Sequence, residues 1–271
     1  MPAQERPLTR APDCVADDWG MSPGVNQGIL ELGEAGVVRC VSLLGSHEHL
    51  ATGLDRLLRL PGMRFSLHLN LTQGPPLSPP EEVPSLCGRN GLFCGLSALL
   101  RRALGGTLSS AEIGIETGRQ AGRVKALGVP LTGVEGHHHA HLLPPVFAAA
   151  AAALRDAGID WVRLPADPGH APSFLAGKAF TGWLGCAVTA QVCRGFRLQR
   201  TLYLNAADRR SAAALDRKLL NADGLPVIVH PAQHDDLALM KHTDSLREER
   251  VAEFRKLLAW SRERRVGPAH A

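Results

Sequence analysis

The chain has 271 residues, of which 45% are hydrophobic and 21% charged, and its formal net charge is +4. This composition is typical of a globular protein, and the length fits one large domain. The basic excess is diffuse and the chain has only one Tyr and seven Phe, so the sequence predicts no nucleic-acid binding.

Strand and helix patterns alternate along the chain. Short apolar runs predict seven strands, at residues 14–16, 37–44, 63–67, 131–134, 160–162, 200–204 and 226–229. Apolar residues at helical spacing predict helices at residues 23–33, 47–60, 96–104, 109–127, 145–157, 175–193, 208–221 and 243–263. This alternation predicts an α/β fold with a largely parallel sheet of about seven strands, either barrel-like and ringed by helices or strongly curved and open.

Several segments are predicted to lie at the surface. Residues 1–12 are polar and are expected to form an N-terminal extension, without the apolar centre of a signal peptide. Residues 73–95 are rich in Pro, Gly and Ser and predict a long loop. The last predicted helix interleaves Arg247, Arg250 and Arg255 with glutamates, a pattern typical of a solvated helix face.

The cysteine content and the hydropathy of the chain indicate the cellular compartment in which it is expected. The six cysteines form no CxxC pair, so a thiolate zinc site is not predicted. The longest weakly charged run, residues 179–192, is too short to cross a bilayer and contains glycines. The sequence therefore predicts a reduced, cytoplasmic protein with a single domain over residues 1–271 and no membrane span.

Polar side chains lie at or just after the ends of five predicted strands. They are Asp17, Asp18, His68, His137, His139, Arg163 and His230. Right-handed crossovers place the carboxyl ends of parallel strands on one face, where barrel enzymes build their active sites. One polar strand end is expected by chance, whereas five predict a catalytic site.

The densest cluster is the segment 137–141, which holds four of the twelve histidines. It follows a predicted strand and precedes Pro144, which can begin a helix. Imidazole is the commonest protein ligand of transition metals. The segment also fits a solvated turn with adventitious metal affinity, but the polar ends of the other strands favour a metal site.

Four motifs resemble those of the YdjC-like carbohydrate deacetylases, the chitooligosaccharide deacetylase family. They are ADDWG with SPGVN at 16–26, LHLNLT at 67–72, GHHHAHL at 136–142 and HP at 230–231, in family order. The sequence departs from the family pattern at Trp19, where Phe is usual, and at Glu135, since an Asp is common two residues before the histidines. The resemblance implies a barrel-like, metal-dependent hydrolase that removes acetyl groups from N-acetylated sugars or sugar conjugates, and a homodimer.

The resemblance assigns Asp18, His68 and His137 to one divalent metal ion and Asp17 to the role of general base. The chemistry of the residues agrees, because two histidines and one carboxylate leave positions open, and a second carboxylate can accept a proton from water. His230 is the expected general acid. We expect magnesium or zinc, and manganese, cobalt and nickel also suit such ligands.

Arg163 and the remaining histidines keep alternative interpretations. Arg163 either orients Asp17 or forms a structural ion pair. If residues 137–141 are extended, His139 and His141 share a side with His137. Each is then a candidate metal ligand, substrate contact or support for a ligand, whereas His138 faces away.

Trp19 and Asn70 are further candidate substrate contacts. Asn70 equally fits a role in satisfying the loop backbone, as such residues commonly do.

Two other functions fit the same face. A metal-dependent phosphoester hydrolase or isomerase would favour a glycine-rich phosphate loop or clustered cations at a strand end, and only Arg163 is found there. A non-catalytic sugar- or metal-binding module has no need of Asp17 beside the metal. Hydrolysis of an N-acetylated sugar is therefore the main hypothesis.

Overall fold

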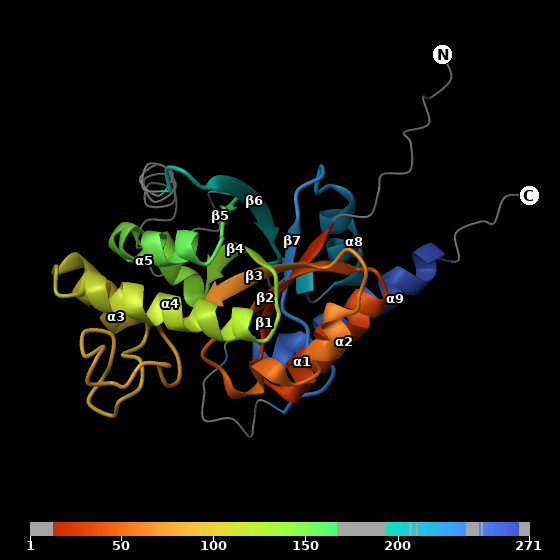
Figure 1. The fold of residues 1–271 in the computed structure, drawn as a ribbon. Helices are drawn as coiled ribbons and strands as arrows, with labels where there is room; N and C mark the ends of the chain where they lie inside the picture. The colour runs from red at the N-terminus through yellow and green to blue at the C-terminus, as the bar shows by residue number, and fades with distance from the viewer. Residues whose placement is uncertain are drawn as a thin grey trace, which may run out of the picture.

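The computed structural model describes residues 13–166, 193–205, 208–209, 211–236, 244 and 246–265. Within this part of the chain, seven parallel strands pair in chain order and close into a barrel through β1 and β7 (Figure 1). The strands are β1 (Cys14–Trp19), β2 (Val38–Leu43), β3 (Arg64–Leu69), β4 (Leu131–Gly136), β5 (Trp161–Pro165), β6 (Arg197–Tyr203) and β7 (Val227–Val229). The predicted fold class is confirmed, and the sheet is a closed barrel.

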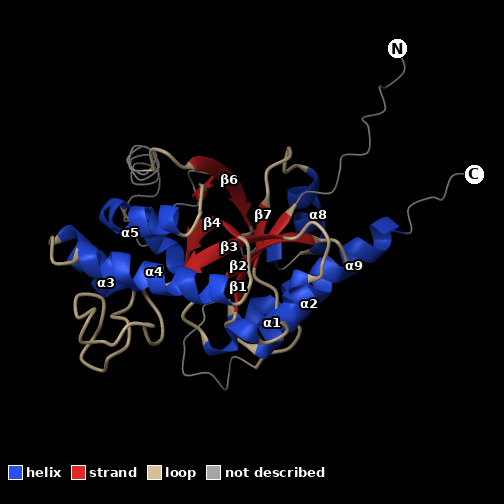
Figure 2. Ribbon diagram, viewed as in Figure 1, coloured by secondary structure: helices blue, strands red, loops and turns tan. Residues whose placement is uncertain are grey.

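Helices cover the outside of the barrel, as Figure 2 shows. The helical elements of the described residues are α1 (Pro23–Glu34), η1 (Glu48–Ala51), α2 (Leu54–Leu58), α3 (Leu96–Leu104), α4 (Ser110–Ala126), η2 (His137–Leu142), α5 (Pro144–Asp156), α8 (Ala212–Leu220) and α9 (Arg247–Arg265). Helix α1 packs against both α2 and α9, and α4 packs against α5. None of the described helices is both long and apolar enough to cross a membrane.

One predicted helix is divided in two, and another lies mostly outside the described residues. The helix expected at 47–60 is divided into η1 and α2, because Thr52 is extended and Gly53 has φ 76°. Glycine adopts this left-handed backbone without the steric cost of a Cβ. The helix expected at 175–193 falls almost wholly outside the described residues.

The barrel interior changes character along its axis. Alternation along the strands separates a large apolar cluster beneath the helices from a small one on the other side of the sheet. The members of the small cluster are Val15, Cys40, Trp161, Tyr203 and Ile228. Two positions further along the same strands, Asp17, Ser42 and Arg163 face the same side, so a polar layer lies above an apolar one.

The polar layer lies inside the strands, close to their carboxyl ends. The strands β1, β3, β4 and β5 each run two or three residues beyond their predicted ends. His68 and Arg163 were expected just after a strand and instead belong to one. Charged residues are rarely buried without a partner. A charged residue after an apolar run was therefore interpreted as the end of the strand.

Candidate metal centre and active site

Two adjacent carboxylates, Asp17 and Asp18, form the β1 side of the site. Adjacent side chains of a regular strand point to opposite faces. Here the register with β2 shifts between Ala16 and Trp19, and Asp18 has φ 72°. Both carboxylates are consequently buried among polar partners, with 1% and 2% of the residue exposed. A left-handed backbone costs most residues about 1–2 kcal/mol, and Asp tolerates it better than most.

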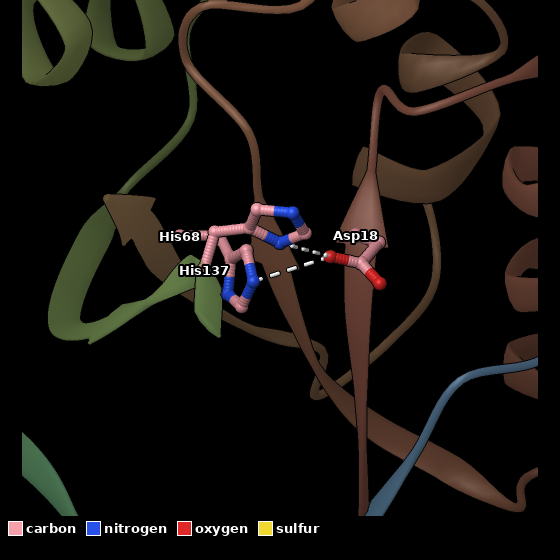
Figure 3. Close-up of side chains that lie close together, drawn as sticks. All are labelled: Asp18, His68 and His137. Atoms are coloured by element: carbon pink, nitrogen blue, oxygen red, sulfur yellow. Dashed lines mark hydrogen bonds and ion pairs between the residues drawn. The ribbon is translucent and has the colours of Figure 1, made fainter. Parts of the chain in front are cut away.

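The three predicted metal ligands, Asp18, His68 and His137, converge from β1, β3 and η2 (Figure 3). His68 Nε2 and His137 Nδ1 each lie 3.2 Å from Asp18 Oδ1. One donor atom of each residue lies within 4.8 Å of the other two, and all three residues are buried. Two imidazole nitrogens and one carboxylate oxygen are a donor set that zinc accepts with positions left open. These residues could therefore hold a divalent ion.

The surroundings favour the charged form of Asp18. Burial alone would raise its pKa, but the Arg250 guanidinium and hydrogen bonds from His137 and His68 hold the pKa of Asp18 well below its usual range. His68 is held in place from its other ring nitrogen, since Ser42 Oγ lies 2.8 Å from Nδ1. This leaves His68 Nε2 facing Asp18, and a histidine fixed in this way is typical of a metal ligand. Ser42 was not predicted from the sequence.

Arg163 binds two buried carboxylates. It donates to Asp17 from both terminal nitrogens, at 2.9 and 2.7 Å, and its Nε lies 2.5 Å from Glu135 Oε2. Glu135 also accepts a hydrogen bond from Ser66. Asp17, His68 and Glu135 form a second potential cation site. A cation there would have to compete with Arg163 for both carboxylates, so the cluster around Asp18 is the better metal site.

His230 follows β7 and faces the same region as His68. Its Nε2 lies 3.7 Å from Asp17 Oδ2, and its backbone N–H donates to Glu253 Oε1 at 2.5 Å. Arg209 Nη2 lies 3.3 Å from the other ring nitrogen, Nδ1. A guanidinium can only donate, so this contact favours a ring whose hydrogen is on Nε2. Burial holds the pKa of His230 well below its usual range; the Asp18 charge opposes this effect and the Arg209 charge reinforces it.

Arg250 belongs to the site, although the charge pattern around it predicted a solvated helix face. It lies on α9 with 1% of the residue exposed, and its Nη2 donates to Asp18 Oδ2 at 2.6 Å. Its Nε donates to Asp244 at 2.6 Å. Glu253, one turn further along α9, is also buried and accepts from Arg209 Nε at 2.7 Å. The predicted solvated face is therefore wrong at these two positions.

The histidine segment is not extended. Residues 137–142 form the short helical element η2, in which His138 and His139 have φ of 52° and 56°. His137 and His139 therefore do not share a side in the manner of a strand. His138 is exposed, and its Nδ1 lies 3.0 Å from Thr72 Oγ1.

His139 and His141 have neighbours within the protein. The His139 ring meets the Tyr203 ring edge-on, with centroids 5.0 Å apart. His141 Nε2 lies 3.0 Å from the carbonyl oxygen of Arg163, and burial lowers the pKa of His141 to about 3. Neither belongs to a potential metal cluster within the described residues. Substrate contact by either histidine stays a prediction.

Trp19 and Asn70 are fully buried. Trp19 Nε1 donates to Leu50 O at 2.8 Å, and Asn70 accepts from the backbone N–H groups of Thr72 and Gln73 at 3.1 Å each. These contacts support the backbone-satisfying alternative for Asn70. The substrate contacts expected of both residues stay predictions.

Comparisons with known proteins extend over most of the chain. Residues 15–262 match the family described as YdjC-like protein. A carbohydrate deacetylase of Mus musculus is 35% identical over 158 residues, which are 57% of this chain and 50% of that protein. A chitooligosaccharide deacetylase of Serratia marcescens is 38% identical over 136 residues, 49% of this chain and 51% of that protein. These two matches span about half the length of each relative.

A longer match and a structural match add to these. A chitooligosaccharide deacetylase of Proteus mirabilis (strain HI4320) is 29% identical over 225 residues, 82% of this chain and 81% of that protein. The structure of a putative cellobiose-phosphate cleavage protein from Enterococcus faecalis V583 superimposes with a TM-score of 0.70 over 95% of both chains. Its sequence identity is 21%, so this likeness concerns the fold alone.

Proposed function

The chain belongs to the YdjC-like protein family, and on that premise we propose that it is a metal-dependent hydrolase that removes the acetyl group from an N-acetylated sugar or sugar conjugate. The names of its relatives, carbohydrate deacetylase and chitooligosaccharide deacetylase, support this substrate class. The observation that carries the proposal is the convergence of Asp18, His68 and His137 next to Asp17, a carboxylate outside that trio.

An amide is a poor electrophile, and the site could promote its hydrolysis in two ways. A divalent ion held by Asp18, His68 and His137 would polarise the acetyl carbonyl and lower the pKa of a water molecule beside it. Asp17 would accept the proton of the attacking water. Arg163 holds both oxygens of Asp17 and so fixes the direction of the carboxylate. General-base catalysis of this kind contributes roughly 10²–10⁴-fold.

The leaving amine needs a proton, and His230 is the proposed donor. Its Nε2 lies on the Asp17 side of the ring, 3.7 Å from Oδ2. Donation to the amine requires the imidazolium form of His230, which burial and the Arg209 charge disfavour and the Asp18 charge favours. Asp17 and His230 would then both face the scissile bond, one accepting a proton and the other donating one.

The ion and the assembly are also proposals. Two nitrogen donors and one oxygen donor suit zinc better than magnesium, which prefers oxygen ligands, and manganese, cobalt and nickel accept the same set. The homodimer is proposed from the family resemblance.

The test is acetate release from N-acetylglucosamine, its oligosaccharides and N-acetylated glycolipid head groups. We expect a chelator to abolish release and a divalent ion to restore it. Release that a chelator leaves unchanged would contradict metal dependence. No release from any substrate by the metal-loaded protein would contradict the deacetylase assignment.

Phosphoester hydrolysis is the weaker candidate. The structure adds Arg250 to Arg163 as a cation near the ligands, but each already binds buried carboxylates. A phosphate would have to compete with these carboxylates. Phosphate release from sugar phosphates, measured with the same metal-loaded protein, separates the two activities.

A further inference from the structure

Residues 70–73 form a turn that begins just after His68 and contacts His137 through Gln73. They follow β3, which carries His68, and lead into the long loop at 73–95. Asn70 clamps this turn through its side chain: its Oδ1 accepts from the N–H of Gln73 at 3.1 Å, and its Nδ2 donates to Gln73 O at 2.7 Å. The backbone of Gln73 is therefore held on both sides.

Helix α4 anchors the same segment. Gln120 accepts from Asn70 N at 3.0 Å and donates to Asn70 O at 2.6 Å. Glu116, which is fully buried, accepts from the N–H groups of Leu77 and Ser78 at 3.0 and 2.9 Å. Both ends of the stretch from 70 to 78 are thus tied to one helix, which makes the position of Gln73 well defined.

The side chain of Gln73 reaches His137. Gln73 Oε1 lies 2.7 Å from His137 Nε2, while His137 Nδ1 lies 3.2 Å from Asp18 Oδ1. An amide oxygen can only accept, so the Nε2 of His137 must carry the hydrogen of this bond. When a metal is bound, Nδ1 carries no hydrogen, and its lone pair then faces the ion beside Asp18 and His68.

We propose that Gln73 is a positioning residue that fixes His137 as an Nδ1 ligand of the metal. The inference rests on the proposed metal site. His68 offers the opposite nitrogen, Nε2, because Ser42 engages its Nδ1. A ligating histidine is commonly oriented by an acceptor for its other ring N–H, and Gln73 supplies that acceptor from the first residue of the long loop.

Two substitutions test the role of Gln73. Gln73→Leu keeps a similar volume and removes the acceptor, so zinc affinity, measured by competition with a chelator, should fall roughly 10–100-fold. Gln73→Glu keeps an oxygen in the same place and should retain wild-type affinity or exceed it. Gln27→Leu, at a partly buried glutamine on the outer helix α1, is the matched control and should leave zinc affinity unchanged.

Nuclear magnetic resonance of the zinc-loaded protein gives a second readout. The Nε2–H of His137 should appear as a ring proton protected from exchange in the wild type and in Gln73→Glu. In Gln73→Leu that protection should be lost. A merely structural role for Gln73 would not move this one proton while the fold, followed by circular dichroism, stays intact.

The outcomes separate this inference from the proposed function. Wild-type zinc affinity and a protected His137 proton in Gln73→Leu would overturn the inference, and so would a wild type that binds no divalent ion. Zinc binding that weakens in Gln73→Leu, in a protein that releases no acetate, would support the role of Gln73 and contradict the deacetylase assignment.

Discussion

Asp17 and Asp18 are adjacent in sequence, yet their partners differ. Asp17 contacts Arg163 and His230, whereas Asp18 contacts His68, His137 and Arg250. Asp17→Asn should therefore retain metal and lose roughly 10²–10⁴-fold in turnover, because it removes the basic oxygen. Asp18→Asn should lose metal affinity, because it removes a charged ligand. Metal content and acetate release across a metal titration measure both effects.

Excess metal should restore part of the activity of Asp18→Asn and none of that of Asp17→Asn. Loss of metal from Asp17→Asn with retention in Asp18→Asn would show that the two roles are reversed.

Arg250 compensates the buried charge of Asp18. Arg250→Met removes the cation and leaves the buried carboxylate without its arginine partner, which typically costs about 3–5 kcal/mol. A divalent ion supplies positive charge to the same carboxylate. Zinc should therefore raise the unfolding temperature of the metal-free Arg250→Met protein more than that of the wild type. An equal rise in both proteins, measured by thermal unfolding with and without zinc, would count against this account.

The sequence indicates most of the candidate site because its residues follow apolar strand runs. Asp17, His68 and Arg163 were found in this way. Arg250 and Glu253 were missed because arginines and glutamates alternate along α9, and the spacing is the same whether a charged face is solvated or turned inward. Only the tertiary position of α9 distinguishes the two cases.

The position of η2 depends on the glycine that precedes it. A Cβ at Gly136, the last residue of β4, would lie 2.7 Å from His141 Nδ1 and 3.0 Å from the backbone nitrogen of His141. Gly136→Ala must therefore shift η2, which carries the proposed ligand His137. Zinc affinity should fall ~10-fold or more, as for other losses of ligand orientation.

Gly122→Ala is the control for this substitution. Gly122 lies in α4 with open space around its Cα. Alanine there should leave zinc affinity unchanged and raise the free energy of unfolding by about 0.4–1 kcal/mol. Wild-type zinc affinity in Gly136→Ala would show that η2 can move without cost to the site.

Element order was predictable from hydrophobic periodicity, whereas backbone irregularities were not. The bulge at Asp18 and the two left-handed residues of η2 carry neither Gly nor Asn, the usual signals of positive φ. Tertiary contacts impose them: Asp18 is held by Arg250, and His138 by Thr72. This is why the sequence left open an extended conformation for the histidine segment.

The stability of the whole molecule should depend on pH through its buried histidines. His141 has a pKa of about 3 in the fold, against an unperturbed value of about 6.5. Between these values the unfolded chain binds a proton that the folded chain does not, so stability falls as pH decreases from about 6.5 towards 3. His141→Gln should reduce this loss in metal-free protein. Denaturant midpoints at pH 7 and pH 4.5 give the comparison, and an unchanged difference would exclude a contribution from His141.

Closure of the barrel through β1 and β7 has a consequence for synthesis on the ribosome. β1 is made first among the strands, but one of its edges has no partner until β7 appears roughly 200 residues later. At ~5–20 residues per second, translation takes roughly 10–40 s to cover this interval. Asp18 must wait longer still for Arg250. Until then the nascent chain carries an open strand edge and Asp18 lacks its arginine partner, so the candidate site is completed only after β7 and α9 have been made.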